Sequence, residues 1–169
     1  MFVSYGQAEL TNVVFRGNTS GANGGGVYSD SGDTVYVNVV FSGNSASSGG
    51  AIANVGSHPS LINTTVSSNT AVSLGGGMFG DFNGSAPTAA TIENSIFAHN
   101  VDSGGTDASA QIHNVGSNTA VISFTLIEDC GGSGASWDAD IGTDGDGNLE
   151  SDPHFVDWSG PDGVAVSAK

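Results

Sequence analysis

The feature that most constrains the fold is an internal repeat of roughly 25 residues. Each copy has an Asn, a large apolar residue three positions later and a second Asn three positions after that. Four copies keep this pattern: Asn12–Asn18, Asn38–Asn44, Asn63–Asn69 and Asn94–Asn100. A degenerate fifth copy, Ser123–Asp129, lacks both Asn residues. A unit this short cannot form its own core, so we expect each copy to bury its apolar side chains against the next.

A second element follows the first in three of the copies. It consists of glycines and then an apolar residue: Gly24–Val27, Gly49–Ile52 and Gly75–Met78. In the fourth copy, Ser109–Ile112 takes its place after an inserted loop rich in Gly and Asp. The glycines predict corners where the backbone needs a positive φ.

Each copy also contains three short apolar stretches, separated by Gly or Asn and too short for helices. Three strands per copy predict an all-β fold, a right-handed parallel β-helix of about five coils. Coils spaced ~4.8 Å apart would give a rod ~24 Å long. We assign residues 1–130 to the coils and residues 131–169 to an acidic, Gly-rich C-terminal loop and cap in the same domain.

We expect three columns of inward-facing side chains to fill the rod. The first is Leu10, Tyr36, Leu61, Ile92 and Val121; the second is Phe15, Phe41, Val66, Phe97 and Leu126; the third is Val27, Ile52, Met78 and Ile112, continued by Ile141. The repeated Asn residues fit corners, because Asn tolerates the left-handed backbone region and its amide can pair with the Asn one coil away. An Asn face that binds sugar or ice is the functional alternative.

The paired signatures Gly49–Ile52 and Phe-x-x-Asn, at Phe15–Asn18, Phe41–Asn44 and Phe97–Asn100, resemble the polymorphic outer-membrane protein repeat. That family lies within the right-handed parallel β-helix repeat class of bacterial surface proteins, and the resemblance covers about residues 7–130. It implies the passenger domain of a surface adhesin. The wider class also includes polysaccharide lyases, glycoside hydrolases and phage tailspikes. The segment Glu150–Asp157 is similar to the Asp-Pro-x-Phe stretch that follows the last coil in such proteins.

The charge of the chain excludes several partners. Lys and Arg number 2 and Asp and Glu 17, a formal charge of −15, so no basic patch can bind nucleic acid. No apolar run approaches the ~18 residues of a membrane span, so we expect no membrane insertion.

The start, Met1–Tyr5, reads like the middle of a domain, and we expect the chain to belong to a longer protein. We expect an extracellular or bacterial cell-surface location, polysaccharide or host-cell glycan as partner, and end-to-end or edge-mediated self-association.

Asp30 and Asp81 are the candidate catalytic pair. They follow Val27 and Met78 at the same offset, two coils apart. That separation, ~9.6 Å, lies at the upper edge of the ~6.5–9.5 Å typical of inverting glycosidases. With 17 acidic residues, a chance pair on one face is the competing interpretation. A lyase would also have to attract an anionic polymer, which the negative charge opposes.

Acidic side chains near the C-terminus form a candidate calcium site. The residues are Asp138, Asp140, Asp144, Asp146 and Asn148. Oxygen side chains alternate along Asp144–Asn148, as in the first half of a calcium loop, although the flanking helices and the final Glu of an EF-hand are missing. The sequence thus predicts bound Ca²⁺ that stabilises the loop, with a solvated acidic loop as the alternative.

Trp137 and Trp158 are the candidate sugar-binding aromatics, and capping the open end of the core is their alternative role. The interpretation we favour is a non-catalytic surface module, a rigid scaffold or adhesin that faces carbohydrate. The first alternative is a carbohydrate-active enzyme, either glycoside hydrolase or polysaccharide lyase. The second is an ice-binding protein, for which the outward column Thr19, Ser45, Thr70 and Val101 is too mixed.

Overall fold

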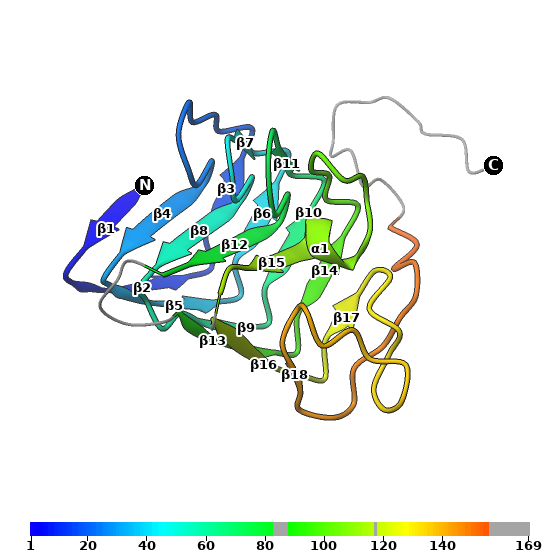
Figure 1. Ribbon diagram of the computed structural model, residues 1–169. Coiled ribbons are helices and arrows are strands. Elements are labelled where there is room, and N and C mark those ends of the chain that lie inside the picture. Colours follow the sequence, from blue (N-terminus) through cyan, green and yellow to red (C-terminus); the bar gives the residue numbers. More distant parts are fainter. Residues whose placement is uncertain (83–87, 117, 156–169) are drawn as a thin grey trace.

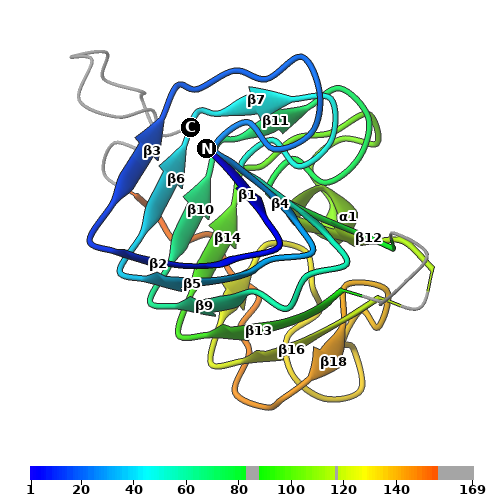
Figure 2. The ribbon, with the colours of Figure 1, turned by 90° about the vertical axis from the view of Figure 1, so that its left-hand side faces the viewer.

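A computed structural model describes residues 1–82, 88–116 and 118–155. Its parallel strands stack into a β-solenoid of about five coils, which confirms the predicted fold class (Figure 1). Seen from the N-terminal end, the first coil runs clockwise through β1, β2 and β3 and then recedes, as a right-handed winding does (Figure 2).

Three sheets run along the rod, one strand per coil. Sheet A contains, in spatial order, β1 (Phe2–Ser4), β4 (Val27–Asp30), β8 (Ile52–Val55), β12 (Met78–Asp81) and β15 (Ile112–Asn114). Sheet B contains β2 (Gln7–Thr11), β5 (Asp33–Val37), β9 (Ser60–Ile62), β13 (Ala89–Glu93), β16 (Thr119–Ser123) and β18 (Thr143–Asp144). Sheet C contains β3 (Val14–Arg16), β6 (Val40–Ser42), β10 (Thr65–Ser67), β14 (Ile96–Ala98) and β17 (Leu126–Ile127).

Three smaller elements lie between sheet C and the next strand of sheet A. The short strands β7 (Ser45–Ala46) and β11 (Thr70–Ala71) pair with each other. The one helix among the described residues, α1 (Ala108–Gln111), belongs to the insertion of the fourth copy. Asp107 caps its N-terminus by accepting hydrogen bonds from the amides of Ser109 and Ala110.

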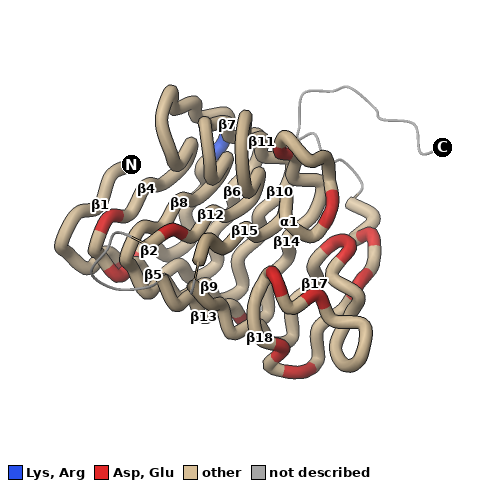
Figure 3. The backbone as a smooth tube through the Cα atoms, viewed as in Figure 1, with Lys and Arg blue, Asp and Glu red and all other residues tan. Residues whose placement is uncertain are grey.

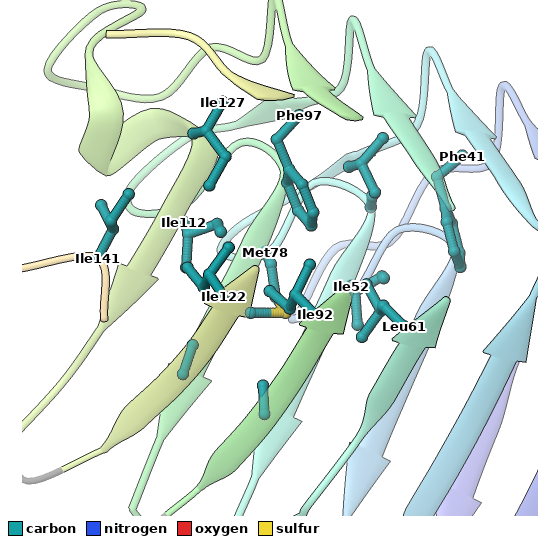
Figure 4. Close-up of a cluster of buried hydrophobic side chains, with 14 of the residues drawn as sticks. Phe41, Ile52, Leu61, Met78, Ile92, Phe97, Ile112, Ile122, Ile127 and Ile141 are labelled. Carbon is teal, nitrogen blue, oxygen red and sulfur yellow. The ribbon is translucent and has the colours of Figure 1, made fainter. Parts of the chain in front are cut away.

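The interior of the rod is a column of buried apolar side chains from all three sheets (Figure 4). Most predicted core residues are fully buried and in register: Tyr36, Leu61 and Ile92 in sheet B, Phe41, Val66 and Phe97 in sheet C, and Val27, Ile52, Met78 and Ile112 in sheet A. Ile141 is buried against the C-terminal end of this column.

The predicted core was wrong at two positions of the fifth copy. Ile122 pairs with Ile92, and Ile127 pairs with Phe97, so these two fully buried residues replace Val121 and Leu126. Val121 is instead 49% exposed. Because side chains alternate between the faces of a strand, aligning this copy one residue early turned every predicted core position outward.

The misalignment has a local cause. The first Asn of each clear copy adopts a left-handed backbone conformation, with φ of 51–58° at Asn12, Asn38, Asn63 and Asn94. In the fifth copy this corner is taken by Phe124, with φ of 49°, and not by Ser123. A bulky residue rarely occupies that region, so the Asn pattern gave no sign of the true corner.

The second Asn of each copy has a different role: it forms the predicted amide ladder. Asn18 Nδ2 donates to Asn44 Oδ1, Asn44 Nδ2 to Asn69 Oδ1, and Asn69 Nδ2 to Asn100 Oδ1, each at 2.9 Å. Asn100 Nδ2 then donates to Gln111 Oε1 at 2.8 Å. The helix of the insertion therefore ends the ladder with a side-chain amide of its own.

Replacement of Phe41 by Ala tests the core. Its ring stacks on Phe15, with centroids 4.9 Å apart, and is fully buried. We expect Phe41→Ala to lower the free energy of unfolding by about 3–5 kcal/mol. Denaturant titration followed by circular dichroism measures the change. The matched variant Phe2→Ala, whose ring is 63% exposed, should cost much less, and an equal cost would contradict the assigned register.

Replacement of Asn69 by Ala tests the ladder. Asn69 accepts from Asn44 and donates to Asn100 and to the Phe41 carbonyl, so its loss leaves buried polar groups unpaired. We expect Asn69→Ala to destabilise the rod by about 1–3 kcal/mol. Asn63→Gly, at a left-handed corner that glycine accepts, should change stability by less than about 0.5 kcal/mol. Equal thermal shifts in the two variants would rule out the ladder as the cause.

Candidate functional site

The outer surface of sheet A carries a column of aromatic residues that the sequence analysis missed. In each strand the residue after the inward-facing one points outward, because side chains alternate along a strand. The strand register aligns these positions from coil to coil. We call this column the aromatic face: Phe2, Tyr28, Ala53, Phe79 and His113.

The aromatic face consists of two stacked pairs of rings. The rings of Phe2 and Tyr28 have centroids 5.4 Å apart, and those of Phe79 and His113 are 6.2 Å apart with an interplanar angle of 17°. Ala53 separates the pairs in the strand register and is fully buried. Phe2 is exposed, Tyr28 and His113 are half-buried, and Phe79 is 6% exposed.

The predicted pair Asp30 and Asp81 lies beside the aromatic face. Both residues align with Val55, one on each side, so they share one column and are two strands apart as predicted. Asp30 Oδ1 accepts from Ser31 Oγ at 3.0 Å, and Asp81 Oδ1 accepts from the Phe82 amide at 2.7 Å. Each carboxylate has a second oxygen, so both can accept further hydrogen bonds from a ligand on this surface.

Tyr28 links the aromatic column to the acidic column. Burial raises the pKa of its phenol above the usual 10.0, and the negative charges of Asp30 and Asp81 raise this pKa further. The phenol therefore stays neutral and keeps its proton as a hydrogen-bond donor. A neutral, hydroxyl-bearing ligand is the kind of molecule that these groups can bind together.

The predicted calcium residues lie at the C-terminal end of the rod, where many Asp and Glu residues are found (Figure 3). The structure uses Asp144 as an internal hydrogen-bond acceptor. Its carboxylate accepts from Ser133 Oγ at 2.8 Å, the Gly134 amide at 2.9 Å and Asn148 Nδ2 at 2.9 Å. These bonds, the Gly134 amide foremost, lower the pKa of Asp144 from 3.8 to about 2.

The other proposed calcium ligands make separate local contacts. Asp138 Oδ1 accepts from the Asp140 amide, and Asp146 Oδ1 accepts from the Gly147 amide. Asn148 Nδ2 donates to the Ile122 carbonyl as well as to Asp144. Across residues 1–82, 88–116 and 118–155, no group of three or more His, Cys, Asp or Glu side chains is placed to hold a metal ion. Binding of Ca²⁺ by this loop stays a prediction.

The two candidate tryptophans differ in what the structure says of them. Trp137 is half-buried against the C-terminal end of the core, and its indole Nε1 donates to the Gly142 carbonyl at 2.8 Å. This position matches the capping role that was its alternative. Trp158 lies outside the described residues.

The outward column considered for ice binding forms a continuous stack. Thr19 bridges to Ser45, Ser45 pairs with Thr70, and Thr70 bridges to Val101. The column is therefore in register, but Ser45 and Val101 interrupt its threonines.

The architecture is that of a β-solenoid repeat protein whose sheet A carries aromatic and acidic residues on its outer surface. Residues 12–30 and 38–55 match the family model of the Chlamydia polymorphic membrane protein repeat. The resemblance seen in the sequence is thereby confirmed for these two segments, whose repeat is that of a bacterial surface and outer-membrane protein family. No curated protein and no solved structure matches the chain. Within the part that the structure describes, no helix has the length and apolarity to cross a membrane.

The hydrogen bonds to Asp144 predict a pH dependence. Because its folded pKa of about 2 lies below the usual 3.8, the contribution of Asp144 to stability is present above about pH 4 and is lost as the pH falls toward 2. Amide hydrogen exchange at Gly134, measured from pH 5 to pH 2, should show this loss. In Asp144→Asn the local protection should no longer depend on this titration, and an unchanged pH profile in that variant would contradict the assignment.

Proposed function

We propose that the chain is a non-catalytic module of an extracellular or cell-surface bacterial protein, serving as a rigid scaffold or adhesin whose aromatic face binds carbohydrate. The observation that carries the proposal is the alignment of aromatic rings on one sheet, beside a column that contains Asp30 and Asp81. The repeat family supports the surface location.

Rigidity follows from how the coils are joined. Every coil pairs with its neighbours through three parallel sheets, and the amide ladder adds a buried bond from coil to coil. Backbone pairing of this kind fixes the spacing of the outward residues at ~4.8 Å per coil. A preorganised surface loses little conformational entropy when it binds an extended partner.

Carbohydrate suits the chemistry of the face. The apolar side of a sugar ring can pack on Tyr28 or Phe2, while its hydroxyl groups donate to the carboxylates of Asp30 and Asp81. The charge of −15 favours a neutral glycan, because an anionic one would be repelled.

Loss of the Tyr28 ring tests this proposal. Retention of the protein on a panel of immobilised neutral polysaccharides should fall about tenfold in Tyr28→Ala, since truncating a central aromatic contact typically costs more than 1 kcal/mol. The matched variant Tyr5→Ala removes a tyrosine that is 84% exposed and is not a member of the aromatic face, and it should bind like the original protein, because only the Tyr5 backbone amide bonds to Asp30. Equal loss in both variants, or no retention on any glycan, would contradict the proposal.

Glycoside hydrolysis is the second candidate, favoured by the shared column of Asp30 and Asp81. A reducing-end assay over the same polysaccharides separates the two functions. Under our proposal no reducing ends appear, and Asp30→Asn with Asp81→Asn weakens binding only. Release of reducing ends that stops in Asp30→Asn would establish the enzyme instead.

A further inference from the structure

A cleft of about 320 Å³ opens at the C-terminal end of sheet A. The sheet stops at β15, and the chain that returns through residues 138–141 does not add another strand to it. A hydrogen bond joins this segment to β15: Asn114 Nδ2 donates to the Ile141 carbonyl at 2.7 Å. The cleft lies between β15 and the returning segment, with Ile112 and Ile141 among its lining residues.

Three polar side chains of the cleft have hydrogen-bonding capacity left over. Asn118 is 7% exposed, and its Oδ1 accepts from the Thr88 amide, but its Nδ2 has no acceptor among the described residues. Neither ring nitrogen of His113 bonds to another described side chain or backbone group, and the same holds for the Asp140 carboxylate. A buried donor without a partner costs stability, which a ligand that supplies an acceptor recovers.

These groups define the chemistry of the ligand. Asn118 donates, Asp140 accepts, and the imidazole of His113 can do either, which together match hydroxyl groups that both donate and accept. Among the described residues no Lys or Arg lines the cleft, so an anion would meet Asp140 without a counter-charge. A volume near the lower end of the ~300–1,000 Å³ range of ligand sites suits a single sugar unit or a disaccharide.

We propose that this cleft is a binding site for one end of a neutral saccharide. His113 belongs both to the cleft and to the aromatic face, where its ring stacks on Phe79. Ala53 and Phe79 are buried, so a glycan contacts this column at Phe2, Tyr28 and His113, and at His113 it reaches the cleft and places its terminal sugar there. This inference rests on the proposed function for its ligand class, but the cleft can be tested by itself with small sugars.

The experiment is a titration of the isotope-labelled protein with glucose, galactose, N-acetylglucosamine and their disaccharides, followed by NMR. We expect shifts at the side-chain amide of Asn118 and at His113, with a dissociation constant on the order of millimolar for ligands this small. His113→Ala and Asp140→Asn should each weaken binding about three- to tenfold. Asp129→Asn makes the same charge change outside the cleft, at a left-handed position that Asn accepts, and should leave binding unaltered.

The outcomes separate the cleft from the aromatic face. Small sugars that bind equally well to the original protein and to His113→Ala and Asp140→Asn overturn the cleft site, as does stronger binding of glucuronate than of glucose. If oligosaccharide binding still depends on Tyr28, the proposed function survives that result. Small-sugar binding that depends on His113 while Tyr28→Ala has no effect on longer glycans supports the cleft and contradicts the aromatic face. Equal shifts with glycerol would show an adventitious additive only, and would also overturn the proposal.

Discussion

Parallel pairing in strict register between one coil and the next is the constraint on which the rest of the molecule depends. It aligns residues some 25–31 positions apart, so that Phe15 meets Phe41 and Asn44 meets Asn69. The apolar columns and the amide ladder can exist only while this register holds. They in turn make any other register costly, because a slip of one residue would bring polar groups inside.

The same register determines what the outside of the rod can do. Each outward position recurs at the spacing of the strands, so outward side chains are arranged in columns along the rod and do not converge on a pocket. Tyr28, Phe79 and His113 align in one column along the sheet, although they are far apart in the sequence. The cleft beside His113 is different in kind: it arises where the repetition ends and the chain must return without another strand.

Most of the fold could be predicted because the same pattern of corners and core positions occurs several times in the sequence. Four copies share their Asn corners and core positions, so errors in one are corrected by the others. The fifth copy failed because Phe124 stands at a left-handed corner where the pattern requires Asn. The paired column of Asp30 and Asp81 followed directly from their offsets. The aromatic face was also readable, since Tyr28 and Phe79 directly follow inward residues, whereas the hydrogen bonds to Asp144 depend on a loop without repeats.

Gln111 gives the amide ladder an end that does not belong to the repeat. Its Oε1 accepts the last side-chain amide bond, and its Nε2 donates to the carbonyls of Asn100 and Thr106. These hydrogen bonds of Gln111 do not depend on how many coils precede it. Duplication of one 25-residue unit upstream would therefore lengthen the rod by ~4.8 Å without disturbing the end that carries the cleft. Reach and terminal chemistry can thus evolve independently in a protein built this way.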